Sequence, residues 1–404
     1  MKNKSYSEKL NYAIRVGVLA ALLLLAPAVL FGGCGKDSGR AASFESTRFL
    51  MDTVVTIRLE AGPSGGIGEE ELREAALAAL ARMEEVAAAA DRYQEGGSDL
   101  RRLSEAAGSG ELVEVSEDLW RMQSRVIALN ETAAARQPLC AGLVNTAMGP
   151  LIDLWAEARQ SLVLPSAEDI AAALALADMS KIALEPAADQ AGSGACLADF
   201  GQGGAENAAA DAGPGFGMAL GAPGMGLDFG AVAKGYAVQA AWQTLKDTGL
   251  DIRGIIDAGG NLMTLGEKPG GGSWSVGIAN PADQSRLLAA LAMEADTVAA
   301  TSGDYQRYAE IGGKRYHHLL SPKDGQPARE NRSATAICGD GMAADYYSTL
   351  LFLLPPKEAL ALAEATEGLE AVIVSGEGKI YVSQGLRDRL TWNQDLGGFS
   401  FAEV

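Results

Sequence analysis

Histidine and cysteine are scarce in this chain, whose 404 residues include two histidines and four cysteines. After residue 34 the cysteines are Cys140, Cys196 and Cys338, an odd number without CxxC spacing, so neither a zinc site nor a disulfide framework is expected. A histidine-rich transition-metal site is equally disfavoured, because His317 and His318 are the only histidines.

Positive charge is also in short supply. Lysine and arginine number 33 against 52 aspartates and glutamates, which gives a formal net charge of −19. This balance argues against a polyanionic partner such as nucleic acid or an anionic lipid surface. A phosphate-bearing ligand would therefore be held by local donors, by a few lysines or by a metal ion.

Long apolar runs are missing except near the N-terminus, where an almost wholly apolar stretch covers 16–31 behind a basic start. Gly32 and Gly33 then precede Cys34, which resembles a bacterial lipobox. The alternative, a transmembrane helix, is disfavoured by Pro27 and by a run shorter than the roughly 20 residues of a span. We expect a lipoprotein signal peptide over residues 1–34 with a lipid on Cys34, a flexible tether over 35–48, and a location on the outer face of the cell membrane.

The remaining chain, 49–404, is expected to form a single large catalytic body. Residues 187–224 consist mostly of Ala, Gly, Asp and Pro and are interpreted as a surface insertion, whose GFGMALG run is a chance glycine pattern. Strand-like segments dominate beyond it and helices interrupt them irregularly, which favours an α+β fold with a mixed, largely antiparallel sheet. Helices are predicted over 69–93, 116–136, 231–248, 343–354 and 357–366 and from about residue 165, strands over 49–59, 253–257, 261–266, 274–278, 287–293, 298–301, 316–320, 334–338, 371–374 and 379–382, and a loop over 93–103.

The segment GLDFGAVAKGYAV, 226–238, places chemistry at the junction between a short apolar run and a helix. Gly230 lets the backbone approach a ligand, and the amides that open the helix can face an anion. Asp228 and Lys234 add a carboxylate and a mobile positive charge. The spacing fits neither a P-loop nor a Rossmann turn. The alternative interpretation is a plain helix start with a surface lysine.

A second candidate lies in the apolar helix MAADYYSTLLFLLP, for which Asp340 is a plausible cap. Asp345 falls inside this helix, where an unpaired carboxylate would be costly. Thr349 is four residues later on the same face, so the two side chains can offer oxygen ligands to one hard cation such as Mg²⁺. The alternative is a buried aspartate that is bonded to a backbone amide of a neighbouring loop.

His318 is a further candidate, in a strand that ends at a Pro/Gly turn. Because strand side chains alternate, His317 and His318 are not expected to serve one site together, and a structural role is the alternative for either. Two glycine-bearing turns complete the set, with Asn261 in the first and Ser302 in the second. Both turns can equally be ordinary hairpins.

Taken in order, these segments resemble the ApbE-like flavin transferases, also called FAD:protein FMN transferases. The resemblance extends over nearly the whole of the predicted catalytic body. It rests on MDT (51–53), RYQEGGSDLRRL (92–103), GPLIDLW (149–155), DFGAVAKGYAV (228–238), DAGGN (257–261), TSGDY (301–305), HLLSPKDGQP (318–327) and ADYYST (344–349).

The resemblance implies Mg²⁺-dependent transfer of the FMN half of FAD to a threonine or serine hydroxyl of an acceptor redox protein, with release of AMP. It also implies an α+β fold and an exported, lipid-anchored form. By position, Asp345, Thr349 and the backbone carbonyl of Ala231 would hold the metal, and His318 and Lys234 would be catalytic. The implied FAD contacts are Met51, Tyr93, Leu143, Val144, Asn145, Asp228, Lys234 and Leu319, together with His318.

The sequence departs from the family pattern at three places. Residues 144–147 read VNTA where the family usually has FDxT, Ser321 stands where aspartate is common, and Ser348 stands where some members have an acidic residue. Two other functions are compatible with the resemblance or the composition. One is Mg²⁺-dependent hydrolysis of FAD to FMN and AMP, and the other is flavin binding by a non-catalytic lipoprotein.

Overall fold

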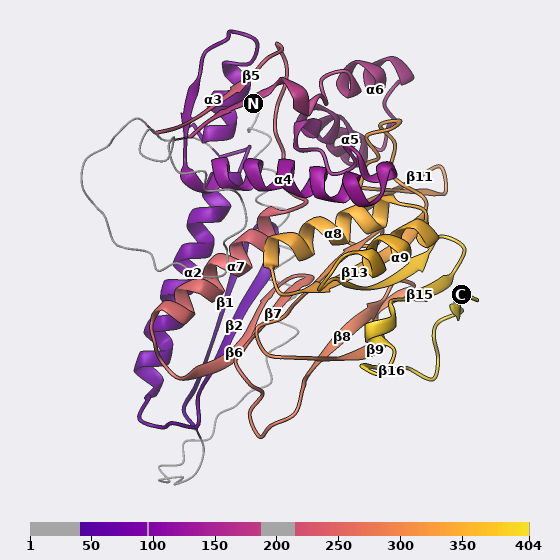
Figure 1. Ribbon diagram of the computed structural model, residues 1–404. Coiled ribbons are helices and arrows are strands. Elements are labelled where there is room, and N and C mark those ends of the chain that lie inside the picture. The colour runs from indigo at the N-terminus through magenta and orange to yellow at the C-terminus, as the bar shows by residue number, and fades with distance from the viewer. Residues whose placement is uncertain (1–40, 95–96, 187–214, 404) are drawn as a thin grey trace, which may run out of the picture. The chain divides into compact units, whose positions relative to one another are not determined.

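The structure is a computed structural model that describes residues 41–94, 97–186 and 215–403 (Figure 1). The predicted signal peptide, Cys34, the tether up to residue 40 and most of the predicted insertion lie outside the described residues.

A large mixed sheet forms the centre of the described chain. All neighbouring strands in it are antiparallel except the last pair, so the predicted α+β fold with a largely antiparallel sheet is confirmed. In spatial order the strands are β1 (Ser43–Leu50), β2 (Thr53–Ala61), β6 (Ile252–Ala258), β7 (Asn261–Leu265), β10 (Val298–Gly303), β13 (Asn331–Cys338), β14 (Glu370–Ser375), β15 (Lys379–Val382) and β17 (Ser400–Phe401).

Three smaller sheets accompany it. One pairs β16 (Leu390–Trp392), β9 (Asp283–Met293) and β8 (Trp274–Asn280); another pairs β3 (Val113–Val115), β5 (Phe216–Leu220) and β4 (Ile182–Glu185); the third is the hairpin of β11 (Tyr308–Ile311) and β12 (Lys314–His317).

The two faces of the large sheet bury different partners. Because strand side chains alternate, Ile255 and Leu262 pack against β8 and β9, whereas their neighbours Ile256 and Met263 pack in the main core with the helices. The helical layer includes α2 (Glu69–Ala90), α4 (Glu117–Arg136), α7 (Ala233–Asp247), α8 (Gly341–Leu353) and α9 (Pro356–Ala365), and α7 and α8 contact each other in it (Figure 1).

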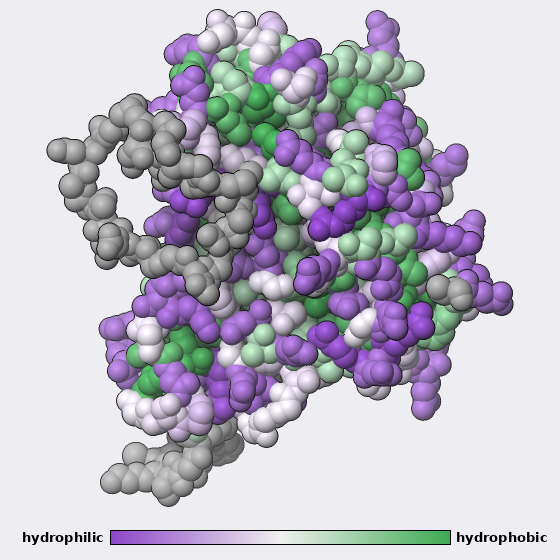
Figure 2. Space-filling model, in the orientation of Figure 1, coloured by the Kyte–Doolittle hydropathy of each residue, from purple (hydrophilic) through white to green (hydrophobic). Residues whose placement is uncertain are grey.

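Helix α8 is the most buried helix of the described chain: all 13 of its residues are buried. Its predicted cap is confirmed, since Asp340 Oδ1 accepts a hydrogen bond from Ala343 N at 2.7 Å. No helix within the described ranges combines the length and apolarity needed to cross a membrane. Hydrophilic residues are spread over the face in Figure 2, with apolar residues in smaller patches between them.

The N-terminal part of the fold corrects two predictions. The strand expected over 49–59 is a hairpin, because Met51 and Asp52 adopt φ of 51° and 57° and turn the chain between β1 and β2. The tether expected up to residue 48 is too long, since β1 begins at Ser43 and pairs with β2 along its length.

Two further segments differ from expectation. The end of the predicted insertion is strand β5, whose Met218 and Leu220 are buried, so the GFGMALG run is structural. Gly217 lies against the exposed Leu112 side chain, which would have to shift to make room for a Cβ atom at this position. The loop expected over 93–103 contains α3 (Asp99–Glu105), which is capped by the Ser98 hydroxyl.

Candidate active site

Helices α7 and α8 cross at two glycines. A Cβ atom on Gly235 would lie 2.1 Å from the Gly341 carbonyl oxygen, and one on Gly341 would lie 2.4 Å from the Gly235 carbonyl oxygen. Only glycine permits this approach at both positions. Asp345, one turn beyond Gly341, is thereby brought against the first turn of α7.

The carboxylate of Asp345 is only 3% exposed and is surrounded by donors. Its Oδ2 accepts a hydrogen bond from Gly235 N at 2.9 Å, and its Oδ1 accepts one from Asn261 Nδ2 at 3.2 Å. Lys234 Nζ is 3.6 Å from Oδ1. The backbone-amide partner anticipated in the alternative interpretation is therefore present, but so is the lysine of the other candidate segment.

Two oxygen atoms beside this carboxylate keep free lone pairs. The Gly235 amide donates to Asp345 rather than to the carbonyl of Ala231, four residues earlier, which a regular helix would engage. The side-chain oxygen of Asn261 is buried and has no hydrogen-bond partner. Buried polar atoms are normally paired, so the unpaired side-chain oxygen of Asn261 indicates that a partner is missing.

Hydroxyl groups extend the same surface. Thr349 follows Asp345 by one turn of α8, and its Oγ1 is 3.3 Å from Ser302 Oγ on β10. Ser348 Oγ donates to the Asp345 carbonyl at 2.8 Å and is 2.9 Å from Ser302 Oγ. We call Asp345, Thr349, Asn261, Ser302 and Lys234 the Asp345 centre.

The donor set of the Asp345 centre suits a hard cation. It offers one carboxylate, hydroxyl and amide oxygens and the free carbonyl of Ala231, which are ligands typical of Mg²⁺. Among the described residues no three His, Cys, Asp or Glu side chains converge. A cation here would accordingly take part of its coordination from water or from ligand phosphates, as Mg²⁺ commonly does.

Asp228 is held on the other side of the α7 start. Its backbone N donates to the Thr146 carbonyl at 2.8 Å, and its Oδ1 accepts from Gly230 N at 2.8 Å. Arg92 Nη1 is 3.6 Å from Asp228 Oδ2. The Gly230 amide thus closes a tight turn that holds the aspartate in place.

Tyr93 lies beside this aspartate, at the edge of an open cavity. Its hydroxyl donates to Asp153 Oδ1 at 2.6 Å, and Arg92 Nη2 donates to Asp153 Oδ2 at 2.7 Å. A cavity of about 380 Å³ is lined by Arg92, Tyr93, Gln94, Arg101, Ser104 and Asp153. Both of its arginines are paired with carboxylates, Arg92 with Asp153 and Arg101 with Glu105 at 2.8 Å.

The segment 143–145 is anchored in the core. Leu143 and Val144 are each 2% exposed, so a ligand would meet their backbone and not their side chains. Asn130 Nδ2 donates to the Val144 carbonyl at 2.8 Å, and Asn130 Oδ1 accepts from the Tyr346 hydroxyl of α8 at 2.9 Å. Asn145 is used locally, because its Oδ1 accepts from Ala147 N and its Nδ2 donates to the Ala177 carbonyl.

Strand β12 ends at His317, so His318 lies beyond the strand and the strand predicted over 316–320 is too long. The surroundings of the two histidines nevertheless differ. His317 is buried, with Nε2 2.8 Å from the Ala328 carbonyl and Nδ1 accepting from Leu319 N at 3.2 Å. Burial lowers the pKa of His317 to about 4, so it is a neutral structural residue.

His318 is positioned by its backbone alone. Its N donates to the Arg307 carbonyl at 3.1 Å, while its Nδ1 is buried without a partner. Burial, followed by the charge of Arg307, lowers the pKa of His318 to about 3. Arg307 Nη2 also donates to the Met51 carbonyl at 3.4 Å, which places the Met51 turn next to the His318 segment.

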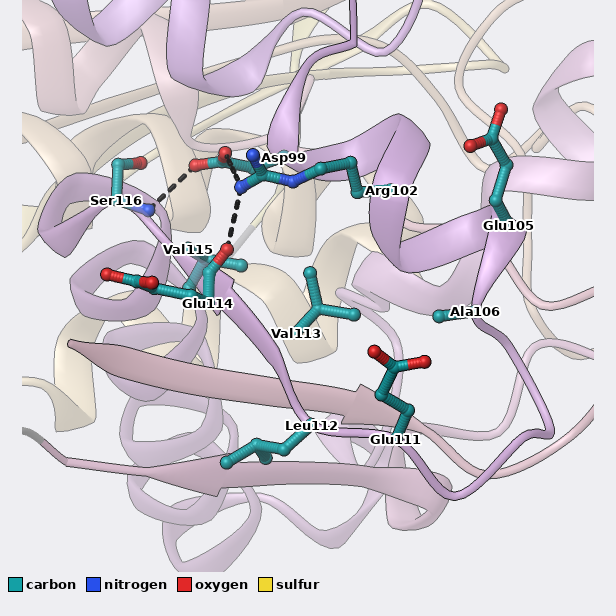
Figure 3. A pocket seen from close by; sticks show the side chains of 10 residues that line it. All are labelled: Asp99, Arg102, Glu105, Ala106, Glu111, Leu112, Val113, Glu114, Val115 and Ser116. Carbon is teal, nitrogen blue, oxygen red and sulfur yellow. Dashed lines mark hydrogen bonds and ion pairs between the residues drawn. The ribbon is translucent and has the colours of Figure 1, made fainter. Parts of the chain in front are cut away.

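A larger cavity of about 760 Å³ lies between α3 and β3 (Figure 3). Glu105, Glu111 and Glu114 line it, and its arginine, Arg102, is already bonded to Asp99 Oδ1 at 2.6 Å and to the Glu114 carbonyl at 2.7 Å. A phosphate-bearing ligand would meet mainly carboxylates there. This cavity is not assigned to the active site.

Sequence reasoning recovered part of the set and missed part of it. Asn261 and Ser302, marked only as turn residues, join the Asp345 centre, whereas Asp304 pairs with Arg315 and Arg332 at 3.4 and 3.3 Å. The bonds of Arg92 were not anticipated. Its position at the start of the RYQEGGSDLRRL motif was the available signal.

Comparison with protein families identifies a match over most of the chain. Residues 51–373 match the model of the ApbE family. An FAD:protein FMN transferase of Klebsiella pneumoniae is 31% identical over 305 residues, which cover 70% of this chain and 85% of the relative. One of Treponema pallidum is 26% identical over 395 residues, or 93% of this chain and 95% of the relative.

Solved structures share the fold. The ApbE protein of Thermotoga maritima superposes with a TM-score of 0.69 at 24% identity and covers 86% of this chain and 99% of its own. The apo form of the flavinyl transferase ApbE of Pseudomonas stutzeri gives a TM-score of 0.64 at 25% identity, with coverage of 87% and 98%.

Proposed function

Since the chain belongs to the ApbE family, we propose that this enzyme is an FAD:protein FMN transferase that moves the FMN moiety of FAD to a threonine or serine hydroxyl of an acceptor protein. The observation that carries the proposal is the Asp345 centre. There a buried carboxylate, a lysine and unpaired oxygen atoms meet at the first turn of α7, a few residues after Asp228.

We propose that Asp345, Thr349 and the carbonyl of Ala231 hold Mg²⁺. The diverted amide of Gly235 and the unpaired oxygen of Asn261 support this assignment, because both leave oxygen atoms available where a cation would need them. When bound, the metal would supply positive charge to the diphosphate of FAD, whose charge rises in the transition state.

The transfer step itself is a substitution at phosphorus. The oxygen of the acceptor hydroxyl forms a bond to the phosphorus of the FMN half, and the bond from that phosphorus to the bridging oxygen breaks, so AMP leaves with this oxygen. Lys234, held by Asp345, would neutralise negative charge on the reacting phosphate.

We propose that His318 is the general base that accepts the proton of the acceptor hydroxyl. Its Nδ1 is free to accept a hydrogen bond and its ring is neutral, which a general base requires. A base with a pKa of about 3 is weak. Burial is the main cause of this low pKa and neighbouring cations are the second, and the negative charge of bound FAD would offset the effect of the cations.

The nucleotide contacts follow from the cavity near Asp228. We propose that Tyr93, Met51 and Asp228 contact FAD, with the backbone of 143–145 and Leu319 as further contacts. Tyr93 is exposed and lines the cavity, and Met51 is joined to the His318 segment through Arg307. An aromatic side chain at that place suits stacking on a flavin or adenine ring.

The setting of the reaction is proposed from the sequence. The basic start, the apolar run and Cys34 favour a lipid-anchored enzyme on the outer face of the cell membrane, with a membrane-associated redox protein as acceptor. Replacement of Cys34 by alanine should abolish the incorporation of labelled fatty acid into the protein. Undiminished incorporation in this variant would contradict a lipid on Cys34.

One incubation separates the candidate functions. The protein is mixed with FAD, Mg²⁺ and a candidate acceptor, and the acceptor is weighed by mass spectrometry. Addition of one FMN mass supports transfer. Free FMN and AMP with an unchanged acceptor would indicate hydrolysis, and intact FAD would indicate binding alone.

A further inference from the structure

Helix α5 (Gly149–Ser161) carries an arginine toward the His318 segment. Trp155 of α5 stacks on Tyr316 with ring centroids 5.6 Å apart, and its Nε1 donates to the Gly325 carbonyl at 2.7 Å. These contacts fix α5 against the strand and turn that flank His318. Arg159 follows Trp155 by one turn and so extends along the same face of the helix.

The guanidinium of Arg159 combines a buried nitrogen that has no hydrogen-bond partner with the lack of a carboxylate partner among the described residues. Its Nη1 is buried and has no hydrogen-bond partner. Arg253, which also has a buried unpaired nitrogen, lies 3.5 Å from a glutamate oxygen. Within the described ranges, by contrast, no carboxylate lies within ion-pair distance of Arg159. The Arg159 side chain is partly buried, and a partly buried charge with a shielded nitrogen and no counter-charge is costly, which points to an anion that completes the site.

A second arginine, Arg307, adds positive charge near Arg159 and so also favours a bound anion. Burial lowers the pKa of Arg159, and the like charge of Arg307 lowers it further. Arg307 has only a 3.6 Å contact with the exposed Asp52 as a counter-charge. The His318 segment joins both elements, since the His318 amide donates to the Arg307 carbonyl and the nearby Tyr316 stacks on Trp155 of α5.

We propose that Arg159 and Arg307 form a phosphate-binding pair that holds a phosphate group of the FAD diphosphate beside His318. This inference rests on the proposed function. Guanidinium groups match phosphate oxygens with two parallel hydrogen bonds, and a diphosphate carries the charge that two arginines require. The pair and Lys234 together give this acidic protein a local positive surface.

The test is a comparison of two flavins without turnover. Affinities for FAD and for riboflavin, which has no phosphate, are measured by flavin fluorescence in the presence of a metal chelator. In Arg159→Gln we expect FAD affinity to fall at least tenfold and riboflavin affinity to stay within twofold of the native value. The FAD affinity of Arg159→Lys should lie between those of the native protein and Arg159→Gln, because lysine keeps the positive charge but cannot donate two parallel hydrogen bonds.

The control is Arg121→Gln on the exposed face of α4, which should leave both affinities unchanged. The melting temperature of ligand-free Arg159→Gln should equal or exceed that of the native protein, since an unpaired, partly buried charge is removed. Unchanged FAD affinity, or an equal fall for both flavins, would overturn the phosphate pair. Absence of FMN transfer by a native protein that binds FAD would instead overturn the proposed function and leave the pair intact.

Discussion

Asp345 and Arg159 are both charged side chains in partly or fully buried positions, but their surroundings are opposite. Asp345 receives a backbone amide, a side-chain amide and a lysine. Arg159 has a buried nitrogen with no partner, and burial and the positive charge of Arg307 both lower its pKa. The difference indicates which part of the site is complete within the chain itself and which part needs a ligand.

The carboxylate is prepared for its role by the fold. Its donors come from α7 and β7, and the crossing of Gly235 and Gly341 sets their positions before any ligand arrives. Such preorganisation avoids reorganisation during the reaction. The arginine, in contrast, has a favourable environment only with an anion present, so its contribution is to binding.

The largest expected effect comes from removal of the carboxylate charge. In Asp345→Asn, AMP release from FAD at saturating Mg²⁺ should fall at least about 1,000-fold, because the charged oxygen ligand is lost while the side-chain shape is kept. Turnover is measured by chromatography of AMP. Asp340→Asn on the same helix is the control, since asparagine caps a helix as well as aspartate does. Similar activity in both variants would remove Asp345 from the site.

The glycine crossing is tested by one methyl group. In Gly235→Ala the Cβ would overlap the Gly341 carbonyl, so the helices must separate and the free energy of unfolding should fall by about 3 kcal/mol. Gly339→Ala is the control, because its Cβ would meet no atom within 4 Å. Denaturant unfolding measures both. Equal stability of the two variants would show that close approach at Gly235 is not required.

The free energy of unfolding as a function of pH tests whether His317 is buried in its neutral form. The folded-state pKa is about 4 and the unfolded value is about 6.5, so the folded state resists protonation. Stability is therefore full above pH 6.5 and declines as the pH falls toward 4. At pH 5 the loss from His317 alone should be about 2 kcal/mol, and His318, whose pKa is also lowered, should add a similar loss that remains in a His317 variant. His317→Gln should flatten the profile between pH 7 and 5 relative to the native protein, and parallel profiles would contradict the buried neutral state.

The smallest effect is expected for the hydroxyl of Thr349. Thr349→Val keeps the shape but removes one of several oxygen atoms, so the Mg²⁺ concentration for half-maximal AMP release should rise about tenfold. Thr366→Val, at a buried threonine bonded to its own helix, serves as the control. An unchanged Mg²⁺ requirement in Thr349→Val would exclude this hydroxyl as a ligand.

The sequence was most informative where the chemistry is local. The spacing of Asp345 and Thr349 on one helix, the cap at Asp340 and the glycine turn after Asp228 depend on residues close in the chain, and the structure contains each of them. Asn261 and Ser302 were noticed as turn residues, but their convergence on α8 depends on the strand order of the large sheet.

What could not be foreseen depends on distant parts of the chain. The pairing of Gly235 with Gly341 brings together residues whose spacing carries no local pattern. Arg159 has an ordinary helical sequence around it, and its lack of a counter-charge becomes visible only when α5 packs on Tyr316. Strand β5 was missed for the same reason, since its glycine-rich sequence is stabilised by pairing with β3 and β4.

The central claim is that the Asp345 centre seats a divalent cation that the reaction needs. The direct measurement is AMP release from FAD by the native protein before and after addition of a chelator, followed by an excess of Mg²⁺. Release should stop with the chelator and return with Mg²⁺, and Mg²⁺ should restore nothing in Asp345→Asn. Undiminished AMP release in the presence of the chelator would contradict the account.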